Sequence, residues 1–401
     1  MIKYISTSEL NDKYGVSNVT VAKWLLLASK GEVNLKFDKV GKRIRMLHTP
    51  ENWFVLDNLG QKATVKRQKI YSSRTSVDPE FYNYFSKDEL TEIVRDLEYK
   101  KYINYKFTYK GEGADYWDQF YQENEENGTY KTPKRTKEVL DRYIPLLVDK
   151  MKNFDEVNIV EIGPGNGLPV INFIKKLKLK VPIKKYIGID ISSDLLDQSI
   201  ENLSNHITDI EYIKLNRDIE RDRIDTAFSY NYSKNTRVAN IVLILGGTIL
   251  NTYETKSILQ SIRRSLNPDD IVLFNSNVND PVNNLNFTYV YSPEVVVQCT
   301  WLPRMLGIDV DNCELVAEFD KDSNQKVAYL VLDKDYTIDF KFGDFQRSIT
   351  LQKKDKIILW MYFITDLHDS SELFREAGFK MLDAITLPDK KHFMIAVQSS
   401  S

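Results

Sequence analysis

The stretch Val157–Gly167, VNIVEIGPGNG, decides the fold class of this chain. It begins with a short, mostly apolar segment that predicts a buried strand, and it continues into three glycines, Gly163, Gly165 and Gly167. A helical pattern follows, and a second apolar segment, YIGID, ends at Asp190. A strand, a glycine-rich loop, a helix and a second strand ending in an acid are typical of one half of a doubly wound, nucleotide-binding α/β sheet.

The spacing of the glycines indicates which kind of ligand the loop would bind. Glycines let the loop pass close to a bound molecule, and an acid at the end of the next strand can accept hydrogen bonds from ribose hydroxyls. The loop reads G-x-G-x-G, with Glu161 two residues before the first glycine, whereas dinucleotide sites read G-x-G-x-x-G. The pattern resembles the first motif of class I methyltransferases, which use S-adenosylmethionine (SAM). NAD binding and a purely structural strand–turn–helix are the alternatives.

Later segments continue the pattern of such a sheet. Asp218 and Ile219 follow the third expected strand, where an acid could reach the adenine amino group and an apolar side chain could pack on the ring. Residues 237–251, RVANIVLILGGTILN, are nearly all apolar, which predicts a central strand. The residues expected to bind SAM are Glu161, Gly163, Gly165, Gly167, Asp190, Ser192, Asp218 and Ile219.

Between residues 100 and 401 the chain also resembles the histidine-specific methyltransferase family. The segments that carry the likeness are FTYKGEGADYWDQF (107–120), NGTYKTPKRTKEVL (127–140), LILGGTILN (243–251) and TWLPRMLGIDVDNCELVAEFD (300–320). The family methylates the α-amine of histidine in ergothioneine biosynthesis. The resemblance implies that Tyr109 and residues 131–136 shape the SAM pocket. It also implies that Tyr130 and Asn251 contact an amino-acid-like substrate, with Tyr109 and Asn251 orienting its amine.

The resemblance breaks at the residues that would hold the substrate side chain. A Glu and a Ser of the family hold the imidazole, whereas the aligned stretch here, KKDKIILWMYFITD (353–366), carries Trp360 and Tyr362. An aromatic surface in place of an acid predicts a substrate other than free histidine, with an apolar or aromatic side chain. The alternation of Ile358, Trp360 and Tyr362 is equally typical of an ordinary half-buried strand.

The N-terminal residues predict a small basic module. Two short helices with a turn at Gly15 are expected between Ile5 and Ser29, and KVGKRIRMLH (39–48) alternates apolar and basic residues as a hairpin does. The order is similar to that of the small DNA-binding domains of excisionase and MerR-type proteins. Residues 1–69 carry a net charge of +7 and the remainder −9, which favours an anionic partner for this module.

Under this resemblance the second helix would enter a major groove and the hairpin would touch phosphates. One such module binds weakly, so binding of duplex DNA would need a homodimer or a partner. The alternative is a helix pair that docks a protein. Methylation of DNA bases is not expected, because GGTILN stands where such enzymes carry a tetrad that stacks the flipped base. The residues expected to contact DNA are Asn18, Thr20 and Lys23, on the exposed face of the second helix, and Lys42, Arg43 and Arg45.

Composition disfavours several other classes. The 401 residues are 42% hydrophobic and 28% charged, as in ordinary globular proteins. Two cysteines, Cys299 and Cys313, give no disulfide framework, and four scattered histidines give no metal-ligand spacing. No apolar run suits a membrane span and no secretory leader is recognisable, so we expect a cytoplasmic protein with neither a membrane nor a metal partner.

Together these patterns predict an α/β protein with a class I (Rossmann-like) methyltransferase domain. Residues 1–66 are the expected helix-turn-helix domain, 67–80 a linker and 81–401 the methyltransferase, in which about 81–145 and 280–362 form a second α+β lobe over the cofactor. The expected function is methyl transfer from SAM to the amine of a small amino-acid-like substrate. The alternatives are a DNA-binding regulator whose methyltransferase-like domain senses SAM or a metabolite, and a methyltransferase of peptide or protein amines.

Overall fold

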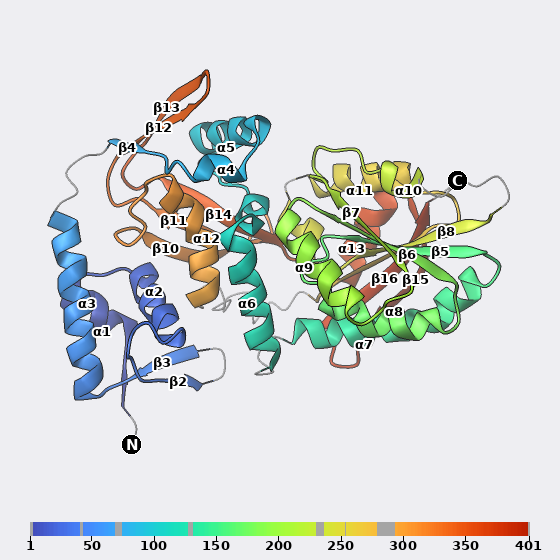
Figure 1. Cartoon of the computed structure of the whole chain (residues 1–401), viewed down its shortest axis with the longest axis horizontal. Coiled ribbons are helices and arrows are strands. Elements are labelled where there is room, and N and C mark those ends of the chain that lie inside the picture. The colour runs from blue at the N-terminus through green and yellow to red at the C-terminus, as the bar shows by residue number, and fades with distance from the viewer. Residues whose placement is uncertain are drawn as a thin grey trace. The chain divides into compact units, whose positions relative to one another are not determined.

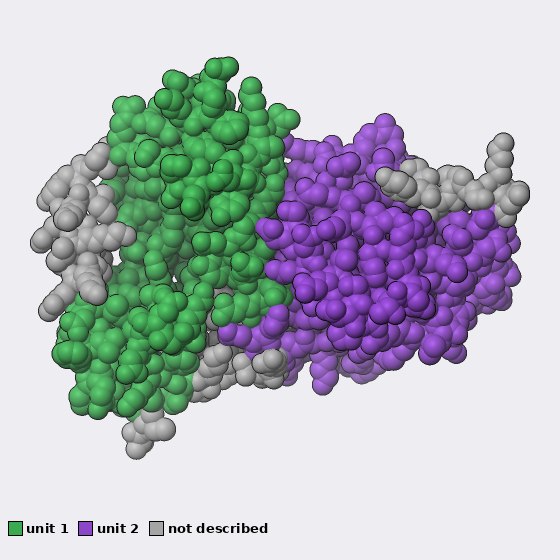
Figure 2. All heavy atoms as spheres, in the orientation of Figure 1, with its two compact units in different colours: residues 1–120, 285–361 green, residues 121–284, 362–401 purple. Residues whose placement is uncertain are grey.

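The computed structural model describes residues 3–40, 43–68, 74–126, 131–229, 236–252, 254–278 and 293–399. The chain divides into two compact units, which Figure 1 shows as ribbons and Figure 2 as space-filling surfaces. Unit 1 holds residues 1–120 and 285–361, and unit 2 holds residues 121–284 and 362–401. Two of the three boundaries between the units fall within helix α6 (Glu112–Glu126) and strand β14 (Lys356–Phe363), and the third, between residues 284 and 285, lies outside the described residues.

Unit 2 is built on a seven-stranded sheet with the order β15-β16-β9-β8-β5-β6-β7. Strand β16 pairs antiparallel with both of its neighbours, and the other pairs are parallel. The strands are β5 (Glu156–Ile162), β6 (Ile183–Asp190), β7 (Glu211–Asn216), β8 (Val238–Ile244), β9 (Ile271–Asn277), β15 (Phe379–Thr386) and β16 (His392–Ser399). The helices are α7 (Thr132–Met151), η2 (Leu168–Val170), α8 (Ile171–Lys178), α9 (Ser193–Ser204), α10 (Thr226–Ser229), η3 (Thr248–Asn251), α11 (Thr255–Ser265) and α13 (Leu367–Glu376).

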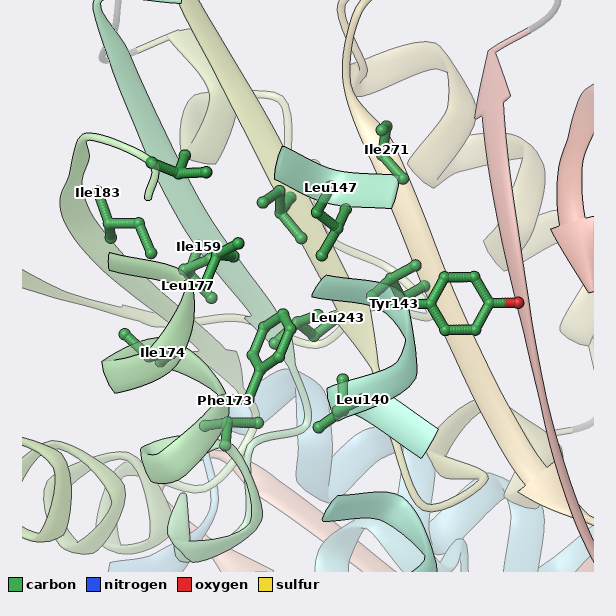
Figure 3. Close-up of a cluster of buried hydrophobic side chains, with 14 of the residues drawn as sticks. Leu140, Tyr143, Leu147, Ile159, Phe173, Ile174, Leu177, Ile183, Leu243 and Ile271 are labelled. Atoms are coloured by element: carbon green, nitrogen blue, oxygen red, sulfur yellow. The ribbon is translucent and has the colours of Figure 1, made fainter. Parts of the chain in front are cut away.

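Helices cover both faces of this sheet, as its near-continuous apolar strands require. On one face, α7 and α8 pack side chains such as Tyr143, Leu147 and Phe173 onto the strands (Figure 3). On the other face, α11 and α13 bury Leu259 and Phe374. The result is a three-layer α/β arrangement whose core lies on both sides of the sheet.

The register of the strands sets the position of the loops that follow them. Ile162 at the end of β5 pairs with Ile189 of β6 and with Ile244 of β8, and Ile244 pairs with Phe274 of β9. The carboxyl ends of these strands are therefore nearly level at one edge of the sheet. Doubly wound sheets bind their ligands at this edge.

The first elements of unit 1 form a helix pair, a three-stranded sheet and a long helix. Ser6 caps the first helix in a capping box with Glu9, and Gly15 ends it in the left-handed conformation (φ 62°). Leu10 and Trp24 belong to the apolar cluster that these elements share. The expected helix pair and hairpin are both present. The elements are β1 (Tyr4–Ile5), α1 (Thr7–Tyr14), α2 (Asn18–Ser29), β2 (Phe37–Val40), β3 (Arg43–Leu47) and α3 (Pro50–Gln68).

The rest of unit 1 contains two further small sheets, with the orders β10-β11-β14 and β13-β12-β4. Its helices are α4 (Phe81–Tyr84), α5 (Lys87–Lys100), η1 (Tyr105–Tyr109) and α12 (Pro293–Met305). Its strands, besides β14, are β4 (Arg74–Ser76), β10 (Glu314–Asp320), β11 (Gln325–Val331), β12 (Tyr336–Phe342) and β13 (Phe345–Leu351). Among the described helices of the whole chain, none is long and apolar enough to cross a membrane.

Two segments differ from the sequence predictions. The segment predicted as a linker, 67–80, begins inside α3 and contains β4, which pairs with β12 and so extends a sheet of unit 1. Helix α7, placed by the sequence in the second lobe, packs instead on the sheet of unit 2. Residues 1–66 fall in the same unit as most of the predicted second lobe, 81–120 and 285–361.

Candidate active site

The glycine-rich loop follows β5 at the carboxyl edge of the unit 2 sheet. Gly163, Gly165 and Gly167 all have positive φ angles, 68°, 56° and 71°, which favour glycine. A methyl group on Gly163 would lie only 2.5 Å from Cγ2 of Thr248. The loops after β5 and β8 therefore touch, and a glycine is required where they meet.

Asp190 lies at the end of β6, next to this loop. Its carboxylate accepts a hydrogen bond from the N–H of Ser192 (2.9 Å), and its backbone oxygen accepts from the N–H of Arg217 and from the side chain of Asn216. Burial raises the pKa of Asp190 to about 6, against the lowering effect of hydrogen bonds from the backbone of Ser192 and Ile191. A partly desolvated carboxylate of this kind is a strong acceptor for hydroxyl groups of a ligand.

Glu161 points away from solvent and is 2% exposed. It accepts a hydrogen bond from the hydroxyl of Tyr186 (2.7 Å). Burial raises the pKa of Glu161 to about 8, the Tyr186 hydrogen bond lowers it, and the charge of Asp190 raises it. The side chain is therefore mainly neutral at pH 7. A neutral carboxyl can link β5 to β6 through its hydrogen bond with Tyr186, but it attracts a cation only weakly.

The other predicted cofactor residues already have local partners. Ser192 caps α9 by accepting from the N–H of Leu195 (3.2 Å), and it is fully buried. Asp218 accepts from the N–H of Glu220 (2.9 Å) in the turn after β7. Ile219 packs at the margin of one apolar cluster of unit 2. These residues shape the turns at the carboxyl edge.

Two predicted substrate residues lie at the loop after β8: Asn251 belongs to this loop, and Tyr362 of β14 contacts it. Asn251 ends η3, and its side-chain oxygen is buried with no hydrogen-bond partner among the residues that the structure describes. The hydroxyl of Tyr362 lies 2.9 Å from Oγ of Ser276, and a methyl group on Gly247 would lie 2.6 Å from that hydroxyl. Within unit 2, the structure thus connects the loop that carries Asn251 both to the glycine-rich loop and to Tyr362.

A buried polar network, which the sequence analysis missed, anchors the β8 loop. The N–H of Gly246 donates to Oδ1 of Asn275 (2.8 Å), and Nδ2 of Asn275 lies 2.9 Å from both Thr136 Oγ1 and His392 Nε2. Nδ1 of His392 lies 3.2 Å from Oδ1 of Asn277. These contacts are all satisfied by a neutral imidazole with its proton on Nδ1, and burial lowers the pKa of His392 to about 4. The sequence could have indicated this network only through the two asparagines at the end of β9, Asn275 and Asn277, and the histidine that begins β16, His392.

Two predicted residues lie in unit 1 instead. Tyr109 is half-buried, and its ring lies 5.0 Å from that of Tyr105 and 6.4 Å from that of Trp117. Trp360 is 6% exposed, and its ring lies 6.4 Å from that of Tyr105. Tyr105 thus joins the two predicted residues into one aromatic cluster.

One of the three residues of α2 that were predicted to contact DNA, Thr20, is buried. Thr20 is 4% exposed, and its hydroxyl donates to the backbone oxygen of Asp311 (3.0 Å). Helix α2 packs against α12 and β10 of the same unit. The expectation that Thr20 is exposed is therefore wrong, because α2 carries apolar residues on more than one face and a helix of this kind packs on more than one side.

Of the other residues predicted to contact DNA or substrate, the structure describes some and leaves others undescribed. Asn18 and Lys23 are half-buried, and Arg45 is exposed with its guanidinium 5.3 Å from the ring of Tyr4. Tyr130, Lys42 and the side chain of Arg43 lie outside the described residues.

Comparison with known families decides the class of this site. The profile of the family described as "Histidine-specific methyltransferase, SAM-dependent" matches residues 89–399. The chain belongs to this family. It is a SAM-dependent methyltransferase with the class I fold, and SAM is its cofactor. No curated protein matches the sequence.

Several solved structures are similar to this methyltransferase at low identity. A SAM-dependent methyltransferase from Clostridium acetobutylicum is 11% identical over 69% of this chain and 99% of its own, with a TM-score of 0.39. The magnesium protoporphyrin IX methyltransferase ChlM from Synechocystis, with bound SAH, is 11% identical over 77% of this chain and 100% of its own (TM-score 0.39). The sugar N-methyltransferase KedS8 from Streptoalloteichus is 12% identical over 71% and 93% (TM-score 0.35).

The residues at the carboxyl edge of the unit 2 sheet fit SAM. The three glycines of the β5 loop have left-handed backbone conformations, and Asp190 offers a carboxylate acceptor beside the loop. We expect Asp190 to hold the ribose hydroxyls of the cofactor.

Proposed function

We propose that this methyltransferase transfers a methyl group to the α-amine of a small, amino-acid-like substrate whose side chain is apolar or aromatic and not imidazole. The observation that carries the proposal is the buried side-chain oxygen of Asn251, which lacks a partner on a loop that contacts the glycine-rich loop. An acceptor left unpaired in this way costs about 1–3 kcal/mol, so such groups usually serve a ligand. An N–H of the substrate amine is a suitable donor.

SAM and the protein contribute different parts of the methyl transfer. When bound, SAM supplies a methyl group on a sulfonium, which is already a good leaving group, so the chain has to align the amine and exclude water. Asn251 would direct the amine by accepting from one of its N–H groups, and Asp190 would fix the ribose. No metal is needed for this reaction.

The proposal excludes histidine as the best substrate because of Trp360 and Tyr362. Neither residue offers a carboxylate, and the hydroxyl of Tyr362 already lies within hydrogen-bond distance of Ser276. An imidazole N–H packed on such rings would lose a hydrogen bond at a cost of about 1–3 kcal/mol, enough to reverse a preference.

A turnover screen tests the proposal. Release of S-adenosylhomocysteine should be measured with histidine, tyrosine, tryptophan and leucine at equal concentration, with a small peptide as a fifth substrate. We expect one of the other amino acids to exceed histidine in kcat/KM, and Asn251→Ala to abolish turnover while SAM affinity stays within about twofold. If histidine gives the highest kcat/KM, the alignment across residues 351–363 is wrong and this part of the proposal fails.

The contacts of the described residues do not favour a DNA-binding regulator as a second function. The only predicted DNA-contacting residue of α2 that the structure fully buries, Thr20, is bonded to Asp311 within unit 1. No described contact favours an anionic partner for α2.

A further inference from the structure

Asn202 of α9 bonds to the glycine-rich loop by a contact that the sequence analysis did not indicate. The side chain is half-buried, and its Nδ2 donates a hydrogen bond to the backbone oxygen of Asn166 (2.9 Å). Asn166 lies between Gly165 and Gly167 and is fully buried. The bond therefore joins the loop after β5 to the helix after β6, across 36 positions of the chain.

A second contact places the same helix against the same loop. A methyl group on Gly167 would lie 3.0 Å from the backbone oxygen of Ser199 and 3.2 Å from Cδ1 of Leu203. Carbon atoms pack best at about 3.5–4.0 Å, so a side chain at Gly167 would push the loop away from α9. The backbone of the loop thus packs directly on α9, and Asn202 supplies a hydrogen bond at this contact.

Hydrogen bonds on both sides fix one peptide group of the loop. The backbone oxygen of Asn166 accepts from Asn202, and the N–H of Gly167, on the same peptide bond, donates to the backbone oxygen of Pro164 (3.0 Å). The side-chain oxygen of Asn166 accepts from the N–H of Leu168 (3.2 Å). These bonds restrain a loop whose glycines could otherwise adopt many backbone conformations.

Helix α9 is attached to the expected ribose acid as well. It begins directly after the turn in which the N–H of Ser192 donates to the carboxylate of Asp190 (2.9 Å), and Ser192 caps it. All of these residues belong to unit 2. One helix therefore connects the two parts of the cofactor site, Asp190 and the glycine-rich loop.

We propose that Asn202 is a positioning residue for SAM, which keeps the glycine-rich loop in its binding conformation relative to Asp190. Asn202 acts through the loop and not by contact with the cofactor. Without its hydrogen bond, the SAM-free protein would populate several loop conformations. Only the competent fraction binds SAM, so the apparent affinity falls in proportion to that fraction. The proposal concerns the cofactor alone and does not depend on which substrate is methylated.

Two substitutions of Asn202 test the proposal by SAM binding to the full-length protein. Asn202→Asp keeps the shape of the side chain but replaces the donor with a carboxylate oxygen, whereas Asn202→Ala removes the amide altogether. Both should raise the Kd for SAM about five- to tenfold, the loss expected for one side-chain hydrogen bond. Titration calorimetry measures the Kd at a temperature at which circular dichroism shows each variant to be folded.

The same two substitutions at Asn205 are the matched control. Asn205 caps the end of α9, and its side chain is exposed. Asn205→Asp and Asn205→Ala make the same chemical changes on the same helix, and they should leave the Kd for SAM within about twofold of wild type. If they weaken binding as much as the Asn202 variants do, the effect belongs to the helix and the proposal is wrong.

Melting temperatures, measured without SAM, separate positioning of the loop from general stabilisation. If both Asn202 variants lower the melting temperature but bind SAM within about twofold of wild type, Asn202 only stabilises the fold and the proposal is wrong. If Asn202→Ala weakens SAM binding and Asn202→Asp does not, packing rather than the hydrogen bond holds the loop, which also overturns the proposal.

Discussion

At the residue scale, the cofactor site depends on how Asp190 is surrounded. Its carboxylate is partly desolvated and receives a hydrogen bond from the N–H of Ser192, so its remaining acceptor capacity can serve a ligand. Each charge-assisted hydrogen bond from a ribose hydroxyl is worth about 1.5–3 kcal/mol.

Asp190→Ala should therefore weaken SAM binding at least tenfold without unfolding the protein. Calorimetric titration of wild type and variant measures the change, and circular dichroism checks the fold. Glu161→Gln is the matched control, because it replaces a carboxyl that is mainly neutral at pH 7. Unchanged affinity in a folded Asp190→Ala variant would remove Asp190 from the cofactor site.

The raised pKa of Asp190 also predicts a pH dependence of SAM binding. The carboxylate is the form that accepts two ribose hydrogen bonds, and in the free protein it becomes protonated as the pH falls through about 6. Affinity should fall below this pH, by up to about tenfold per unit. Asp190→Asn should bind more weakly and lose this dependence, as titrations between pH 5 and 8 would reveal. A wild-type affinity that is flat across this range contradicts the assignment.

At the element scale, the β8 loop is held by a network that crosses α7, β9 and β16. The sequence indicated the apolar strand β8, and the family resemblance placed Asn251, in the segment that follows it, in contact with the substrate. The sequence did not predict the network, because the partners Thr136, Asn275 and His392 are distant in the chain and meet only through the strand register. A single sequence carries the alternation of a strand but not its pairing partner.

His392→Leu should destabilise the protein by about 1–3 kcal/mol, because the amide of Asn275 loses an acceptor. The effect should depend on pH. The pKa of His392 is about 4 when folded, below its ordinary value, so the unfolded chain binds the extra proton first. The stabilising contribution is complete above about pH 6.5 and is lost, by up to about 3 kcal/mol, as the pH falls towards 4.

Denaturant titrations at pH 7 and pH 5 would measure this effect, with the exposed His206→Gln as control. The destabilisation caused by His392→Leu should be smaller at pH 5 than at pH 7. An equal destabilisation at both pH values would show that His392 is not buried in its neutral form.

Helix α2 is the element whose environment the sequence analysis predicted wrongly. Val19, Ala22 and Leu26 are buried, yet they lie on the helix face opposite the cluster that contains Val21, Trp24 and Leu25. Since α2 packs against α12 and β10, we infer that this second face contacts them. The stretch WLLLA indicates that α2 is buried on a second face, because the outer face of an amphipathic DNA-binding helix is polar.

Leu26→Arg tests this packing. A charge placed on the second face should destabilise the protein by more than about 3 kcal/mol, because it is buried without a partner. Asp12→Arg, at an exposed position of α1, should change the free energy of unfolding by less than about 0.5 kcal/mol. If the Leu26→Arg variant were as stable as wild type, the second face of α2 would be exposed to solvent, as in a DNA-binding helix, and the inferred packing would be wrong.

At the scale of the whole molecule, the sequence predicted the methyltransferase sheet well and the division of the chain less well. The glycine-rich loop, the acid at the end of β6 and the apolar β8 are local signals, and all three belong to the largely parallel sheet of unit 2. The grouping of residues 1–120 with 285–361 depends on contacts between segments far apart in the chain, such as β4 with β12 and α2 with α12. No local pattern encodes those contacts.

The proposed function requires that this SAM-dependent methyltransferase acts on the α-amine of an amino-acid-like substrate. The most direct measurement is the position of the transferred methyl group. The full-length protein is incubated with methyl-labelled SAM and the best substrate of the turnover screen, and the product is fragmented in a mass spectrometer. We predict that the label is on the α-nitrogen. A label on a side-chain oxygen, nitrogen or carbon, or no labelled amino acid at all, would contradict the account.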